Sequence, residues 1–164
     1  LVTKAEVRAV ALGKLAIPTS GVIWDVGAGS GSVAIEVAAL ASHARVIAVE
    51  RHAEDVRRIE ANATEHGVTI EVVHGEAPEA LEPLPDPDRV FVGGGGTAVL
   101  DAVLARLSPG GRVVATFAAL DRAAAAYERL GNLAEVSVAR GRPLAGGVRL
   151  QAENPVCVVW GPGS

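Results

Sequence analysis

Short apolar runs alternate with longer stretches of mixed polarity through the first half of the chain. The apolar runs at residues 22–26, 45–49 and 69–73 have the length and the valine and isoleucine content that are typical of buried strands. Between them, residues 32–40 and 53–66 have the length and pattern of helices. Strands and helices that alternate in this way are joined by crossover connections, which make consecutive strands parallel. The pattern therefore predicts a parallel sheet covered by helices.

An amphipathic helix is predicted ahead of the first strand, within the segment VTKAEVRAVALGKL. Its apolar face consists of Val7, Val10, Ala11 and Leu15. Thr3 and Glu6 have the spacing of a capping box, in which each side chain accepts a hydrogen bond from a free backbone amide at the helix start. Pro18 follows the last apolar residue and ends the helix.

The second half of the chain continues the alternation. A strand is predicted in RVFVGGGG, followed by a helix at residues 97–107 that Thr97 would cap. The segment SPGGRVVATFA is a turn into a fifth strand. The remaining predicted elements are a helix at residues 122–130, a strand near residues 135–139, a polar loop at residues 140–155 and a last strand at residues 156–160.

Composition agrees with an α/β fold class. The chain has 164 residues, which is enough for one domain with a full core. Hydrophobic residues make up 49% and aromatic residues 3%, so the core must consist mainly of alanine, valine, leucine and isoleucine, as in sheets covered by helices. The single cysteine, Cys157, lies in the run VCVVW and is expected to be a small core residue. No disulfide framework or metal motif is present in the sequence.

Charge and hydropathy exclude several classes of partner. The formal net charge is -4 and there is no basic tail, which gives no support for binding to nucleic acid or to an anionic membrane. No window approaches the roughly 18 apolar residues of a membrane helix, and no signal segment opens the chain, so a cytoplasmic protein is expected. The chain begins LVTK and contains no methionine, from which we expect a domain excised from a longer polypeptide.

The main candidate for a binding site is the glycine loop, residues 27–31, between the first predicted strand and its helix. Open α/β sheets bind ligands at this turn, where glycine lets the backbone approach a ligand closely. The dinucleotide fingerprint G-x-G-x-x-G is not met, because Ser32 stands where the third glycine would be. Asp25 lies two residues before the loop, and its carboxylate would disfavour a pyrophosphate and favour a cation.

Two further segments end at the same edge of the predicted sheet. Glu50 closes the second strand, where an acid accepts hydrogen bonds from both ribose hydroxyls. Gly75, Glu76 and Ala77 follow the third strand, where an adenine could contact the backbone. A nucleoside with a positive charge and no phosphate satisfies both carboxylates, which indicates S-adenosylmethionine, with S-adenosylhomocysteine as its product. The alternative is that Asp25 and Glu50 only cap helices.

These residues resemble those of class I S-adenosylmethionine-dependent methyltransferases: the motif D-x-G-x-G-x-G, the acid that closes the second strand, and LSPGGRVV before the fifth. The decarboxylating precorrin methyltransferases of cobalamin biosynthesis are more narrowly resembled by five segments together: TKAEVRA, WDVGAGSGSVAIE, GEAPEAL, VFVGGGG and ARGRPLAGGVRLQAENPV. The resemblance implies a Rossmann-like, mostly parallel seven-stranded sheet with an antiparallel last strand. It also implies methylation at carbon 15 of a precorrin macrocycle and decarboxylation of its ring C acetate arm, in an order that the sequence leaves open.

The same resemblance bears on partners. In that family the domain occurs alone or as the C-terminal domain of a bifunctional C5,15-methyltransferase, in which an N-terminal methyltransferase domain of the same polypeptide would be its partner. A homo-oligomer is expected, with a polycarboxylate tetrapyrrole as substrate.

Thirteen residues are predicted to contact the cofactor: Thr3, Asp25, Gly27, Ala28, Gly29, Ser30, Gly31, Glu50, Arg51, Gly75, Glu76, Ala77 and Gly93. The resemblance puts Thr3 near the methionine end of the cofactor. The tetraglycine segment, which consists of Gly93, Gly94, Gly95 and Gly96, would lie beside the transferred methyl group and leave room for a ring system. Methyl transfer mainly requires alignment, so no catalytic acid or base is assigned. Of the four histidines, His74 alone is expected near the cofactor.

A flat macrocycle that carries many carboxylates needs cations in its site. If the sixth strand is parallel to the first five and the last strand antiparallel, the loop between them lies on the same face as the glycine loop. Three arginines of this loop are predicted to bind substrate carboxylates through their planar guanidinium groups: Arg140, Arg142 and Arg149. Lys4 at the first helix is a fourth candidate. The alternative is that the arginines pair with surface acids.

Other functions remain as alternatives. A NAD-dependent oxidoreductase conflicts with the missing third glycine and with Asp25. An S-adenosylmethionine-dependent methyltransferase for another small molecule, a protein or RNA would use the same cofactor site, but the chain lacks a basic stripe and an Asn-Pro-Pro-Tyr motif. A non-catalytic scaffold would be expected to have a damaged glycine loop, and this loop is intact.

Overall fold

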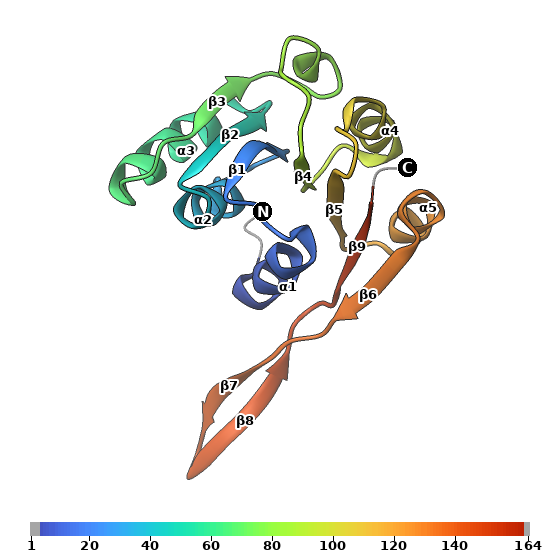
Figure 1. Cartoon of the computed structure of the whole chain (residues 1–164). Helices are drawn as coiled ribbons and strands as arrows, with labels where there is room; N and C mark the ends of the chain where they lie inside the picture. The colour runs from blue at the N-terminus through green and yellow to red at the C-terminus, as the bar shows by residue number, and fades with distance from the viewer. Residues whose placement is uncertain (1–3, 163–164) are drawn as a thin grey trace.

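The computed structural model describes residues 4–162, so both predictions for Thr3, as a capping residue and as a cofactor contact, lie outside the described residues. Within this range the main sheet has seven strands in the order β3-β2-β1-β4-β5-β9-β6 (Figure 1). Their bounds are β1 Ser20–Val26, β2 His43–Glu50, β3 Glu71–His74, β4 Arg89–Val92, β5 Arg112–Phe117, β6 Asn132–Val136 and β9 Val156–Pro162.

The sheet has the strand directions that were predicted. β1 pairs in parallel with β2 and β4, β2 with β3, and β4 with β5. β9 lies between β5 and β6 and is antiparallel to both, so β6 is parallel to the first five strands. The carboxyl ends of β1 to β6 therefore share one edge of the sheet, and the segment between β6 and β9 starts from that edge.

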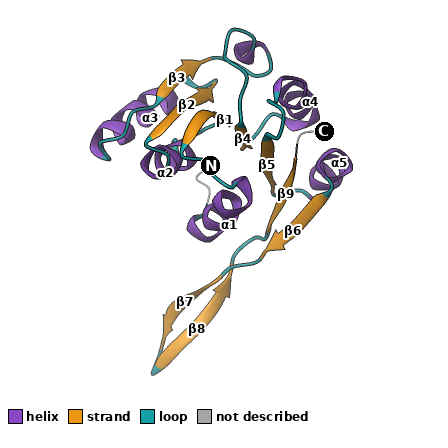
Figure 2. Ribbon diagram, viewed as in Figure 1, coloured by secondary structure: helices purple, strands orange, loops and turns teal. Residues whose placement is uncertain are grey.

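Helices cover both faces of the sheet, as Figure 2 shows. On one face lie α1 (Ala5–Leu15), α2 (Ser32–Leu40) and α3 (Ala53–Glu65), and on the other lie α4 (Gly96–Arg106), α5 (Leu120–Leu130) and the short 3-10 helix η1 (Glu79–Leu81). Successive side chains of a strand point to opposite faces, so Ile23 packs toward α1 and α2 while Trp24 packs toward α4. Cys157 is buried, as expected of a core residue.

The segment predicted as a polar loop is instead a β-hairpin, which consists of β7 (Ala139–Leu144) and β8 (Gly147–Ala152) and extends away from the main sheet (Figure 1). Gly146 at its turn has a positive φ of 75°, which glycine adopts without strain. The strand predicted near residues 135–139 is correspondingly shifted, because β6 ends at Val136.

Two helix starts also differ from the sequence predictions. The predicted cap at Thr97 is wrong, because α4 already begins at Gly96 and its N-cap is Gly95, whose φ is 102°. The tetraglycine segment therefore turns the chain sharply after β4. The N-cap of α1 is Lys4, and the Glu6 carboxylate, predicted for a capping box with Thr3, accepts hydrogen bonds from Arg140 of the hairpin. Among residues 4–162, no helix is both long and apolar enough to span a membrane.

Candidate functional site

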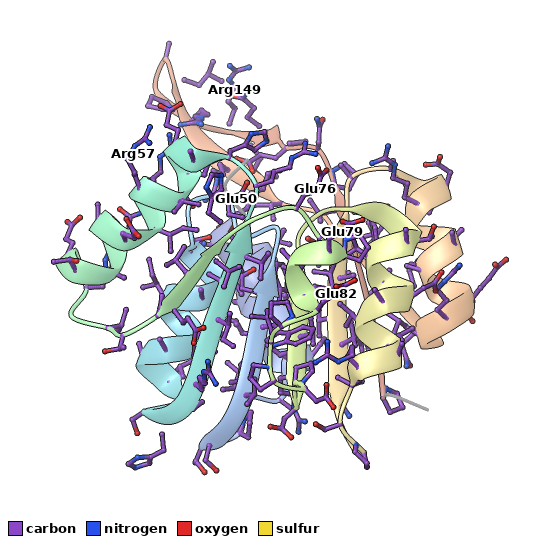
Figure 3. The ribbon with its side chains drawn as sticks, turned by 90° about the horizontal axis from the view of Figure 1, so that it is seen from above. Glu50, Arg57, Glu76, Glu79, Glu82 and Arg149 are labelled. Carbon is purple, nitrogen blue, oxygen red and sulfur yellow. The ribbon has the colours of Figure 1, made fainter. Side chains whose placement is uncertain are left out.

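A cavity of about 300 Å³ opens at the carboxyl ends of β1, β2 and β4. We call it the β1–β2 cavity. Four segments with sequence-predicted contacts form its wall: the glycine loop, Glu50 with Arg51, residues 75–77, and the start of the tetraglycine segment. Figure 3 shows Glu50 and Glu76 at this edge of the molecule, with Arg149 on the hairpin away from both. The volume lies at the lower end of the range of small-molecule sites.

The glycine loop and the tetraglycine segment are in contact through their backbones. Gly27, Gly29 and Gly31 all have positive φ angles, between 55° and 76°, which glycine tolerates best. A Cβ atom on Gly27 would lie 3.1 Å from the Gly94 nitrogen, and one on Gly93 would lie 2.9 Å from the Gly27 oxygen. The absence of side chains therefore allows the two loops to form one continuous floor of the cavity.

Glu50 is the acid of the cavity wall and is only 6% exposed. Its Oε2 accepts a hydrogen bond from the Gly29 amide at 2.9 Å, and its Oε1 accepts one from the His52 amide at 2.9 Å. Each carboxylate oxygen can accept more than one hydrogen bond. The two amides thus fix the orientation of Glu50 and leave acceptor capacity toward the cavity, which suits a vicinal diol.

Asp25 lies behind the glycine loop and is not among the described residues that line the cavity. Its Oδ2 accepts a hydrogen bond from the Ala34 amide in the first turn of α2 at 2.9 Å, whereas its buried Oδ1 has no hydrogen-bond partner. Burial raises the pKa of Asp25 to about 7; the Ala34 hydrogen bond opposes this shift and the charge of Glu50 adds to it. The structure therefore places Asp25 behind the glycine loop at the start of α2, and its contact with the cofactor stays a prediction.

Three residues of the glycine loop, Ala28, Ser30 and Gly31, are not among the described residues that line the cavity. Ala28 packs against the core on the α1–α3 face, and the Ser30 carbonyl accepts a hydrogen bond from Asn62 Nδ2 at 3.0 Å. A Cβ on Gly31 would lie 3.0 Å from Ile59 of α3. These residues hold the loop against α3 and thereby shape the cavity indirectly.

The outer rim of the cavity carries an ion pair. Arg51 Nη1 donates to Glu76 Oε1 at 3.1 Å, and both side chains are exposed by more than half. His74 hydrogen-bonds through Nε2 to the Arg51 carbonyl oxygen at 3.1 Å and does not line the cavity among the described residues. Gly75 and Ala77 complete the rim.

Comparison with protein families identifies the family to which the chain belongs. A family model described as "Precorrin methyltransferase domain" matches residues 1–161. The chain belongs to this family. The sequence predicted a class I S-adenosylmethionine-dependent methyltransferase fold for this precorrin methyltransferase domain. The strand order and the solved relatives confirm that fold.

Three relatives give the extent of the similarity. A precorrin-6Y C(5,15)-methyltransferase [decarboxylating] of Sinorhizobium sp. is 40% identical over 162 residues, which are 94% of this chain and 39% of that protein. A protein of Pyrobaculum calidifontis named "probable cobalt-precorrin-6B C(15)-methyltransferase (decarboxylating)" is 40% identical over 169 residues, covering 96% of this chain and 86% of that protein. The solved precorrin-6Y C5,15-methyltransferase of Geobacter metallireducens superposes with a TM-score of 0.91 at 38% identity, covering 98% of this chain and 90% of the other.

The hairpin arginines of this precorrin methyltransferase domain differ in their partners. Arg140 pairs with Glu6 at 2.8 Å and with Glu153 at 2.7 Å, as the surface-acid alternative expects. Arg142 and Arg149 lie opposite each other on the hairpin and are exposed. They share a hairpin face with Arg140, because directly paired residues and every second residue of a strand point the same way. Their role in substrate binding stays a prediction.

Lys4 lies at the base of the hairpin and at a second cavity. Its Nζ donates to the Asn154 carbonyl at 2.8 Å and pairs with Glu153 at 3.1 Å. Hydrogen bonds from Lys4 and Arg140 lower the pKa of Glu153. This second cavity, of about 290 Å³, lies between the starts of α1 and α5, and all four glycines of the tetraglycine segment line it. We call it the α1–α5 cavity.

Sequence reasoning missed several residues that line cavities. His52 and Asp55 at the start of α3 and Val99 of α4 line the β1–β2 cavity. Phe117 and Arg122 line the α1–α5 cavity. A signal was available for all of them, because each lies at or just after the carboxyl end of a predicted parallel strand or in the first turns of the helix that follows it. No group of three or more potential metal ligands occurs among residues 4–162.

Proposed function

We propose that this chain is an S-adenosylmethionine-dependent enzyme that methylates carbon 15 of a precorrin and decarboxylates its ring C acetate arm, in cobalamin biosynthesis. The observation that carries the proposal is the buried Glu50 carboxylate, oriented by two amides at the wall of a glycine-floored cavity. The names of the Sinorhizobium and Pyrobaculum relatives support the substrate and both reactions.

The residues of the β1–β2 cavity fit S-adenosylmethionine, which supplies an electrophilic methyl group. Glu50 would accept hydrogen bonds from the ribose hydroxyls, while residues 75–77 would lie along the adenine. Gly27 and Gly93 line the cavity without side chains, so their backbone would contact the cofactor. Thr3 is proposed to lie near the methionine end.

The tetraglycine segment is proposed to position the acceptor carbon. Methyl transfer is an in-line displacement, which depends on holding the nucleophile and the methyl group at near-attack distance. Gly93, Gly94 and Gly95 line both the β1–β2 cavity and the α1–α5 cavity, so a ring system in the second cavity would meet the cofactor over these glycines. In the decarboxylation, the conjugated macrocycle would take up the electrons released with carbon dioxide, and the chain would hold the acetate arm out of the ring plane.

The direct test is turnover with two labels. The purified chain is incubated with methyl-labelled S-adenosylmethionine and with a precorrin labelled in the ring C acetate carboxyl, and methyl transfer and carbon dioxide release are measured separately. Both signals are expected, and binding of NAD is not. Methyl transfer to RNA or protein without transfer to the precorrin would contradict the proposal and favour the alternative methyltransferases.

We further propose that the chain acts as a homo-oligomer. One face of the hairpin is apolar, because Pro143 pairs with Val148 and Gly141 with Leu150. Val148 is 74% exposed and Leu150 75% exposed in the single chain. A second copy of this chain would remove that surface from water. The cytoplasmic location stays a prediction.

A covalent partner domain is also proposed. The Sinorhizobium relative is much longer than its matched region, whereas the Pyrobaculum relative is mostly covered, so relatives with and without additional sequence both exist. We propose the longer arrangement here, with an N-terminal methyltransferase domain in the same polypeptide. The mass of the native protein in an immunoblot of source cells tests this arrangement.

A further inference from the structure

Three cavities meet at the tetraglycine segment. Besides the β1–β2 and α1–α5 cavities, a third cavity of about 650 Å³ lies at the starts of α4 and α5, and we call it the α4–α5 cavity. Gly95 lines all three cavities. The three cavities therefore share this part of their walls.

Arg122 and Phe117 line both of the cavities outside the β1–β2 cavity. Phe117 is the last residue of β5, and Arg122 is in the first turn of α5. Phe117 lines this space with an aromatic side chain, and Arg122 adds a cation to the same walls. Lys4 contributes the second cation of the α1–α5 cavity from the opposite face of the sheet.

Of the three cations that line these two cavities, Arg122 is the one without an assigned partner. Lys4 pairs with Glu153, and Arg51 pairs with Glu76. Arg122 has no hydrogen bond or ion pair within the described part of the chain, residues 4–162. Its guanidinium thus keeps all five N–H donors for a ligand or solvent.

We propose that Arg122 binds a peripheral carboxylate of the tetrapyrrole and holds the macrocycle over the glycine floor. This inference rests on the proposed function, which supplies the polycarboxylate substrate. A planar guanidinium binds a carboxylate through two parallel hydrogen bonds, so it fixes the direction of the acetate or propionate arm as well as its position. Arg122 is then a substrate-binding and positioning residue without a part in proton transfer.

The neighbouring acid, Asp121, determines in which of the two cavities a carboxylate arm would bind. Asp121 lines the α4–α5 cavity beside Arg122 and does not line the α1–α5 cavity. A carboxylate arm that entered the α4–α5 cavity would meet the Asp121 charge, whereas the described wall of the α1–α5 cavity contains two cations and no acid. The bound arm is therefore expected on the α1–α5 side of Arg122.

Three variants test the proposal. Arg122→Ala removes the guanidinium, Arg122→Lys keeps the charge without the planar fork, and Arg57→Ala is the matched control. Arg57 is an exposed arginine of α3 without a partner among the described residues, and it lines none of the three cavities (Figure 3). For each variant we would measure KM and kcat with the precorrin, calorimetric affinity for S-adenosylhomocysteine, and fluorescence-detected binding of an octacarboxylate porphyrin.

Arg122→Ala is expected to raise KM and to weaken porphyrin binding by about 5- to 30-fold, because it removes one charge-assisted hydrogen-bonded pair. The effect of Arg122→Lys should be smaller, because lysine keeps the positive charge. Affinity for S-adenosylhomocysteine should stay within about twofold, since Arg122 does not line the β1–β2 cavity. Unchanged KM and porphyrin affinity would overturn the proposal, as would an equal loss of S-adenosylhomocysteine affinity.

The porphyrin measurement separates this inference from the proposed function. If the wild-type chain binds the porphyrin but transfers no methyl group to a precorrin, the proposed function fails. The porphyrin affinities of Arg122→Ala and Arg57→Ala then still decide the role of Arg122. If the wild-type chain does not bind the porphyrin, the inference about Arg122 fails even where methyl transfer occurs.

Discussion

Asp25 is an acid whose environment favours its neutral form. It keeps its proton in the folded chain up to about pH 7, whereas the ordinary pKa is 3.8. Between these values the folded chain binds a proton that the unfolded chain has lost. The contribution of Asp25 to stability therefore falls as the pH rises through this window and is constant above it.

We expect Asp25→Asn to remove this pH dependence. Asparagine resembles the protonated acid, because each accepts the Ala34 hydrogen bond and carries a donor on its second polar atom. Relative to wild type, the variant should gain stability from about pH 4 upward and reach a plateau above about pH 7, of at most about 4 kcal/mol. Urea unfolding at a series of pH values measures the difference.

Asp101 provides a control, because its pKa is shifted in the opposite direction from that of Asp25. A hydrogen bond from Arg129 lowers the pKa of Asp101, so Asp101→Asn should destabilise the chain at neutral pH and lose this effect as the pH falls. A difference between wild type and Asp25→Asn that does not vary with pH would contradict the assignment of a neutral Asp25.

Glu50→Ala is expected to weaken binding of S-adenosylhomocysteine by at least about tenfold. Each hydrogen bond to a charged acceptor contributes about 1.5–3 kcal/mol, and the variant removes the acceptor of both ribose bonds. Glu79→Ala is the matched control, because Glu79 is an acid of η1 that does not line the β1–β2 cavity (Figure 3). Calorimetry on both variants is the measurement, and equal affinities would refute the role of Glu50.

At the scale of elements, the sequence predicted the parallel strands and their helices to within a few residues, and it placed Glu50 and Glu76 at the right edge. These elements are buried on at least one face, so their apolar pattern is clear. The hairpin was missed because β7 has no buried residue and its run Arg140, Gly141, Arg142 and Pro143 shows no apolar alternation. Arg122 was missed because the helix prediction rested on propensity alone, although its place in the first turn after the fifth strand was a signal for the cavity edge.

The contact between the glycine loop and the tetraglycine segment gives a prediction with a close control. Gly93→Ala would place a Cβ 2.9 Å from the Gly27 oxygen, so one loop must move. We expect a loss of about 1–3 kcal/mol in the free energy of unfolding and a Tm lower by about 2–12 °C. Gly94→Ala should leave Tm nearly unchanged, because nothing lies within 4 Å of the added atom. Calorimetric melting compares the two, and equal Tm values would show that the loops are not in close contact.

For the whole molecule, the exposed apolar face of the hairpin, with Val148 and Leu150, predicts that the chain forms a homo-oligomer. Replacing Val148 and Leu150 with lysine adds two charges to that face, which should dissociate the oligomer because buried charges must lose their hydration. Gln151→Lys adds a charge to the opposite face and is the control. Sedimentation velocity measures the outcome, and a wild-type chain that sediments as a monomer would contradict the proposed oligomer.

Lys4 belongs at once to the wall of the α1–α5 cavity and to the ion-pair cluster at the base of the hairpin. An anion that binds Lys4 in the cavity shares the charge of the ammonium group that already pairs with Glu153, and the anion and the Glu153 carboxylate repel each other. Thermodynamic linkage then makes the effect mutual. The free energy by which a bound anion weakens the Lys4–Glu153 ion pair equals the free energy by which that ion pair weakens binding of the anion. In an assembly joined through its hairpins, occupancy of one subunit's cavity would in this way alter the affinity of its neighbour.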